Sequence, residues 1–301
     1  MTDLTLLWEA APKALLYASL LPALGACAAR WVLLPRLGVV LSEAAFARVE
    51  RSLGRIGLVS AIVVLAATLL RAWTHTVAAF GFAEAQSWEA VRVIAFESRW
   101  GSGWTLQAAA AALLAASYLL ATVLPRIGWP MTVASGAALC VALPLLGHAA
   151  GSAGRMAIHT AHLVGAGLWL GTLVAVWAVA RLESRRGVDR DDAQSVAPVI
   201  LQQFSTLALF GAALLLLAGV AAAALYLGSL SSLWTTGYGR TLSLKVALLA
   251  AIVACGFVNW RRFGDPDLER STLPSTVPLE VALALAVALA TSVLTELEHP
   301  S

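Results

Sequence analysis

The chain carries little charge. Only 12% of its 301 residues are charged, whereas 60% are hydrophobic and the mean hydropathy is +0.82. Because soluble domains carry about 25% charged residues, this composition excludes a soluble protein and predicts a polytopic protein in a lipid bilayer. The net charge of +3 resides mainly in short loops, where basic residues orient a membrane protein, so nucleic acid is not expected as a partner.

The chain also lacks the cysteine pattern of a disulfide framework or a zinc site. Cys27, Cys140 and Cys255 are far apart and form no CxxC pair, and we expect them to be apolar fillers. A basic start is missing as well, since Met1-Thr2-Asp3 includes an acid where a signal peptide needs positive charge. The first apolar stretch is therefore predicted to stay in the protein as a helix.

Long apolar runs predict the fold. A membrane-spanning helix needs about 20 apolar residues. Eight runs of this kind lie near residues 12–34, 53–74, 103–124, 131–150, 156–180, 204–229, 240–261 and 277–297. The predicted fold class is an all-α membrane protein, with a bundle of eight transmembrane helices in a single polytopic domain over residues 1–301.

The distribution of basic residues predicts the orientation. Thirteen Lys and Arg residues lie in the connections after the first, third, fifth and seventh helices, and six lie on the opposite side. Because basic residues accumulate in cytoplasmic loops, these four connections are predicted to be cytoplasmic. Both termini then face outward.

The longest outer connection, residues 75–102, has its own pattern. Trp88, Val91 and Ile94 recur at helical spacing, which predicts a short helix on the outer membrane surface or a lid over the outer mouth. The alternative is an ordinary packed loop.

A weak internal similarity suggests a duplication. Trp100-Gly101 and Thr105-Leu106-Gln107 at the start of the third helix correspond to Tyr238-Gly239 and Ser243-Leu244-Lys245 at the start of the seventh. Two four-helix halves inserted in the same direction would form a parallel repeat. We treat this arrangement as a hypothesis.

Other unusual residues have simpler interpretations. Lys245 is expected to snorkel to the membrane interface; the alternative is that it repels or gates a cation. Asn259 and Glu280 are expected to cap the inner ends of their helices or to lie at the helix boundary there. The motifs Gly147-x-x-x-Gly151 and Gly167-x-x-x-Gly171 predict close helix packing.

Histidine is the best clue to function. All five histidines fall at or beyond the outer ends of the predicted helices: His75, His148, His159, His162 and His299. A single histidine at an interface is usually a hydrogen-bonded boundary residue, which is the interpretation we favour for His75 and His299. Three histidines at intramembrane ends are harder to explain in that way.

The spacing predicts a metal site. His159 and His162 share one helix face about 4.5 Å apart along the axis, with Met156 on the same face, and a glycine-rich turn returns the chain from His148. Imidazole and thioether ligands suit copper. We therefore predict that His148, His159 and His162 bind copper, and that Met156 and His75 supplement them.

At these residues the sequence resembles the copper resistance protein D (CopD) family of bacterial inner-membrane proteins. The matching segments are Pro144–Ala149, His159–Gly171, Phe204–Ser205, Gly237–Arg240, Leu244–Lys245, Asn259–Arg262 and Glu280. The resemblance implies eight transmembrane helices and movement of copper from the periplasm to the cytoplasm, without catalysis. It also implies a periplasmic copper-binding partner.

The leading hypothesis is a copper permease or copper-binding protein of the inner membrane with periplasmic termini. A rival is a membrane cytochrome, in which histidines on adjacent helices ligate haem b and the small residues Ala149, Ala161 and Gly165 provide the slot. A third is a non-transporting receptor that docks a periplasmic copper chaperone through residues 75–102.

Overall fold

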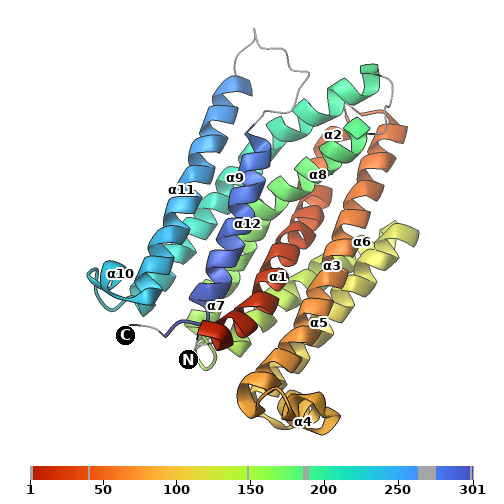
Figure 1. Cartoon of the computed structure of the whole chain (residues 1–301). Helices are drawn as coiled ribbons and strands as arrows, with labels where there is room; N and C mark the ends of the chain where they lie inside the picture. The colour runs from red at the N-terminus through yellow and green to blue at the C-terminus, as the bar shows by residue number, and fades with distance from the viewer. Residues whose placement is uncertain are drawn as a thin grey trace.

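The chain forms a bundle of long helices (Figure 1) in a computed structural model that describes residues 3–39, 41–147, 149–185, 190–263, 276–298 and 300. The first four spans are α1 (Asp3–Ala28), continued by a π turn (Ala29–Leu33) and α2 (Leu34–Leu37); α3 (Glu43–Phe80); α5 (Arg99–Val123); and α6 (Pro125–Ala142), continued by a 3-10 turn (Leu143–Leu146). The last four are α7 (Ala153–Ala166), continued by a π turn (Gly167–Gly171) and α8 (Thr172–Arg185); α9 (Arg190–Tyr226); α11 (Gly237–Phe263); and α12 (Val277–Leu294).

The predicted fold class is confirmed. Within the described ranges there are eight helical segments long and apolar enough to cross a membrane, and no strand. Figure 1 places both marked chain ends, the start of α7, α10 (Ser232–Thr235) and α4 (Trp88–Arg92) toward one end of the bundle. The chain is thus an all-α, multi-pass membrane protein whose ends lie on one side.

Local capping moves some helix ends away from the predicted bounds. The second span, expected near 53–74, covers Glu43–Phe80, because the side chain of Ser42 accepts a hydrogen bond from the backbone N–H of Ala45 at 3.3 Å. Gly81 ends the helix with a φ of 92°, a left-handed conformation that suits glycine. The turns added at the start of the helix are charged, so a search for apolar residues alone leaves them out.

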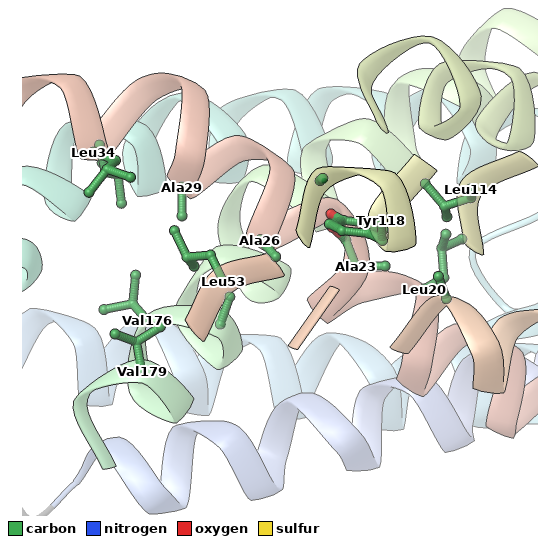
Figure 2. Close-up of a cluster of buried hydrophobic side chains, with 14 of the residues drawn as sticks. Leu20, Ala23, Ala26, Ala29, Leu34, Leu53, Leu114, Tyr118, Val176 and Val179 are labelled. Atoms are coloured by element: carbon green, nitrogen blue, oxygen red, sulfur yellow. The ribbon is translucent and has the colours of Figure 1, made fainter. Parts of the chain in front are cut away.

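Helix α1 is central to the core. It packs against α3, α8, α12 and the π turn Gly167–Gly171. Its residues Leu20, Ala23 and Ala26 are fully buried. Figure 2 shows them among side chains from α3, α5 and α8. The hydroxyl of Tyr118 in α5 donates a hydrogen bond to the carbonyl of Ala23, which satisfies a polar group that would otherwise be costly to bury.

The prediction of close helix packing holds for one of the two glycine motifs and fails for the other. Gly171 confirms the packing prediction, because a Cβ there would collide with the backbone carbonyl of Leu21 in α1, and a Cβ at Gly25 would collide with the backbone of Gly171. The prediction for Gly147 and Gly151 is wrong. A Cβ added at either glycine would have no atom within 4 Å, because both lie in the turn between helices.

Two π turns lie at equivalent positions in the two halves of the proposed internal repeat. Ala29–Leu33 in the first span and Gly167–Gly171 in the fifth lie 138 positions apart (167 minus 29). The same interval separates Gly101 from Gly239 (239 minus 101). A Cβ at Gly101 would collide with the backbone of Ala95, just before the third span, and a Cβ at Gly239 would collide with the backbone of Ser232 in α10, just before the seventh. Such a constant interval favours duplication.

A side-chain contact repeats at the same interval. Thr105 Oγ1 donates to the carbonyl of Ala95 at 3.4 Å, and Ser243 Oγ donates to the carbonyl of Leu233 at 3.5 Å. Both donors and both acceptors differ by 138 positions (243 minus 105, 233 minus 95). The third and seventh spans therefore begin with the same local packing, which is what two parallel halves predict.

The connection between α3 and α5 is largely helical, as expected. It contains a 3-10 turn (Glu84–Gln86), α4 and a π turn (Val93–Glu97). Arg92 is bonded to Glu89 at 2.6 Å and to Glu97 at 2.5 Å. The Arg92 guanidinium lowers the pKa of Glu89, and this small ion network holds the segment together beyond the ends of the spans.

Candidate functional site

The described histidines lie at one end of the bundle. His75 is near the end of α3, where it contacts Glu9 in the early turns of α1. His159 is near the start of α7, where it contacts Tyr226, the last residue of α9. Tyr226 in turn packs in a cluster with Leu294, the last residue of α12. The prediction that the histidines share one face is confirmed for these residues; His148 and His299 lie outside the described residues.

A hydrogen bond fixes the His159 ring. Its Nε2 and the hydroxyl of Tyr226 are 3.2 Å apart, and the two ring centroids are 5.6 Å apart. The guanidinium of Arg155, one turn earlier, lies 5.7 Å from the centre of the Tyr226 ring. A partner on one imidazole nitrogen orients the ring and sets its tautomer. Tyr226 therefore has the position of a residue that supports a ligand.

His162 contains an unsatisfied polar atom. Its Nδ1 is buried and makes no well-formed hydrogen bond among the described residues, although the ring also interacts with the backbone of Leu215 in α9. On α9, the Cβ position of Gly219 is 3.2 Å from Cε1 of the ring, so the helix backbone lies directly against the imidazole. A buried polar atom without a partner is costly. A metal ion bound to Nδ1 would remove that cost, so this residue fits the ligand role predicted for it.

Lys245 is a residue of this site that the sequence interpretation placed wrongly. Its side chain does not snorkel to the interface, because it is only 9% exposed. Its positive charge interacts electrostatically with the imidazole of His162. Its position in α11, beside the histidine of α7, depends on how the helices are arranged in space. A cation in this position would oppose the approach of a second one.

The other predicted ligands are placed differently. Met156 is half-buried in the first turn of α7, one turn before His159. The His75 ring is stacked on Trp100 with centroids 4.2 Å apart, and its Nδ1 is 3.2 Å from Glu9 Oε1. These contacts tie His75 to α1 and α5, whereas His159 and His162 contact α9. In the described part of the chain, no group of three His, Cys, Asp or Glu side chains has metal-binding geometry.

The first half holds a buried polar network that the sequence did not predict. Besides the Glu9–His75 contact, Lys13 forms an ion pair with Glu296, and Arg71, only 6% exposed, donates to Gln107 Oε1 at 2.8 Å. The i, i+4 spacing of Glu9 and Lys13 on α1 was the available signal. Their partners could not be identified, because they come from α3 and the segment after α12. The network joins α1, α3, α5 and the segment after α12 at the histidine end.

Comparison with known proteins finds a family match for the C-terminal part of the chain. No curated protein and no solved structure matches the chain. Residues 198–294 match the family described as Copper resistance protein D, a segment that includes most of α9 and all of α11 and α12. Lys245 and Glu280 lie within it. The match confirms the resemblance noted in the sequence over this C-terminal part of the multi-pass membrane protein.

Proposed function

We propose that this copper-resistance membrane protein is a copper permease of the bacterial inner membrane, which takes copper from the periplasmic side toward the cytoplasm. The observation that carries the proposal is the buried Nδ1 of His162, which makes no well-formed hydrogen bond and lies beside His159. Copper is the substrate in this proposal, bound at the outer end by His148, His159 and His162, with Met156 as a supplementary ligand. His75 would act at the edge of this entry region.

The ligand chemistry supports copper over harder ions. Imidazole and thioether groups are the ligands that copper accepts, whereas magnesium and calcium prefer carboxylate and carbonyl oxygens. Lys245 raises the electrostatic cost of a cation near His162, so an ion held there must gain enough from nitrogen ligands to offset it. A permease also needs a source of copper, and we propose a separate periplasmic copper-binding protein.

Uptake into vesicles tests the permease directly. We expect purified protein in lipid vesicles to accumulate copper inside at a rate well above that of empty vesicles, and we expect His162→Ala to reduce this rate by at least tenfold, since losing even a supporting residue of a metal site costs about 10–100-fold. Copper retained after external chelation is the measurement. A wild-type protein that binds copper but never carries it to the lumen would contradict the permease proposal and favour the chaperone receptor.

The direction of transport depends on the orientation. With 13 basic residues on one side and six on the other, we predict that a reporter active only in the cytoplasm gives no signal when fused after Ser301. The same reporter inserted at Gly187, in an odd-numbered connection, should be active. The reverse pattern would place the histidine end in the cytoplasm and turn the proposed entry site into an exit.

Haem is the alternative occupant of the histidine pair. A haem iron would need an open slot at the imidazole ring, but the α9 backbone at Gly219 lies against the His162 ring. We therefore expect the isolated protein to have no strong Soret absorption. A stoichiometric Soret band that disappears in His159→Ala or His162→Ala would replace the permease with a cytochrome.

A further inference from the structure

A buried polar triad lies at the other end of the bundle. Asn259, near the end of α11, is 7% exposed, and Glu280, in the first turn of α12, is 4% exposed. The side-chain amide of Asn259 donates to Glu280 Oε1, and the hydroxyl of Thr276 donates to Asn259 Oδ1. Both polar ends of Asn259 are therefore used. These residues bind one another across two helices rather than only capping them, which corrects the sequence interpretation.

The triad is far from the histidines. Tyr238, at the start of α11, packs with Tyr226, which contacts His159. Asn259 follows Tyr238 along one continuous helix, and at 1.5 Å per residue the two are about 31 Å apart. That distance is close to the ~30 Å thickness of the hydrocarbon layer. Glu280 thus lies near the opposite membrane face.

Several cations near this face already contact other groups; Arg181 of α8, for example, lies 5.6 Å from the centre of the Trp177 ring. Helix α12 packs against α11, α1 and α8. At their inner ends the charged groups form other pairs: Arg30 with Glu50 at 2.6 Å, and Arg48 with Glu183 at 3.3 Å; Arg261 lies over the Phe257 ring, 5.8 Å from its centre. Among the described residues, the side chain that interacts with the Glu280 carboxyl is that of Asn259, which is neutral and forms a hydrogen bond with it.

An ionised carboxylate in this position needs a counter-ion. Removing a charge from water without a partner costs several kcal/mol, and ionisable groups inside a membrane usually mark ion or proton pathways for this reason. A metal is a poor counter-ion here. Calcium takes about six to eight oxygen ligands and copper prefers nitrogen and sulfur, whereas the Asn259 oxygen is already bonded to Thr276. A proton needs only one carboxylate oxygen.

We propose that Glu280 is a proton-binding site on the inner side of the membrane, positioned by Asn259. The carboxylate takes a proton from the cytoplasmic side to form the neutral acid, whose Oε1 still accepts the Asn259 hydrogen bond, and later returns it. No other bond forms or breaks. We further propose that this exchange is coupled to copper movement; the coupling rests on the proposed permease function, whereas the proton site does not.

Infrared spectroscopy tests the proton site without copper. An exposed glutamate has a pKa of about 4.3 and is ionised at neutral pH, so a protonated-carboxyl band at neutral pH identifies a buried acid. We expect this band in wild-type protein in lipid vesicles, its loss in Glu280→Gln, and its retention in the matched control Glu183→Gln. A Glu280→Asp variant should shift the band rather than remove it. Absence of the band in the wild type, or its persistence in Glu280→Gln, would overturn the proposal.

Coupling is tested by copper uptake with a pH-sensitive dye inside the vesicles. Wild-type protein should bind and release protons at the inner face as it takes up copper, and Glu280→Gln should lose this proton signal while it binds copper within about twofold of wild type, because the histidines are about 30 Å away. Copper uptake with no proton movement in the wild type would refute coupling. No copper uptake at all would refute the permease, and the infrared result would still decide the proton site.

Discussion

Replacing His162 with alanine is expected to remove most of the bound copper. If three imidazoles share one ion, losing one removes a direct ligand, and even a supporting residue is worth about 10–100-fold in metal affinity. The affinity of His162→Ala should therefore fall by at least about a hundredfold. Because Nδ1 of His162 is buried without a well-formed hydrogen bond, the substitution removes a poorly satisfied atom. We expect the variant to fold as well as the wild type.

The matched variants separate a shared site from independent boundary residues. His148→Ala and His159→Ala should weaken copper binding as strongly as His162→Ala, while His299→Ala should leave it unchanged. Tyr226→Phe removes the hydrogen bond to His159 and should cost about tenfold. Binding isotherms of the purified variants provide the measurement. If all three single variants kept wild-type stoichiometry and affinity, these histidines would not form a metal site.

The sequence predicted the parts of the structure that depend on the membrane. Eight apolar runs are enough to give eight spans, because a hydrocarbon layer requires long helices of uncharged residues. An even number of spans brings the chain ends to one side. Because successive spans alternate in direction, the end of the second span, with His75, and the start of the fifth, with His159, lie on that same side. The exact helix ends were less predictable, since a single cap such as Ser42 decides where the polar turns of α3 begin.

The side-chain partners could not be predicted. Glu9 and His75 are 66 positions apart in the sequence, and Asn259 and Glu280 are 21 apart. Their spacing indicates which helix face each occupies, but not which helix it faces. The same reason explains the error at Lys245, since a lysine near a helix end snorkels unless a neighbouring helix covers it. The buried Glu280 and the unsatisfied His162 became visible only when the helices were packed together.

The contact between the first and fifth spans yields the largest expected effect on stability. Gly171 lies against the backbone of α1, where a Cβ would collide with the carbonyl of Leu21, and backbone atoms cannot move aside as the end of a side chain can. Overpacking of a core costs about 1–3 kcal/mol, and we expect Gly171→Ala to be at the upper end of this range. At about 2–4 °C per kcal/mol, the midpoint of thermal unfolding should fall by roughly 6–12 °C.

Gly256→Ala is the matched control for this prediction. Gly256 lies within α11 and has no atom within 4 Å of a Cβ position, so the added methyl meets open space. Alanine favours a helix over glycine by about 1 kcal/mol, and this variant should be as stable as the wild type or slightly more stable. The two substitutions are chemically identical, so the difference in their unfolding midpoints in the same detergent isolates the helix contact. Equal midpoints would show that the first and fifth spans do not meet at Gly171, and the arrangement of the two halves would have to be different.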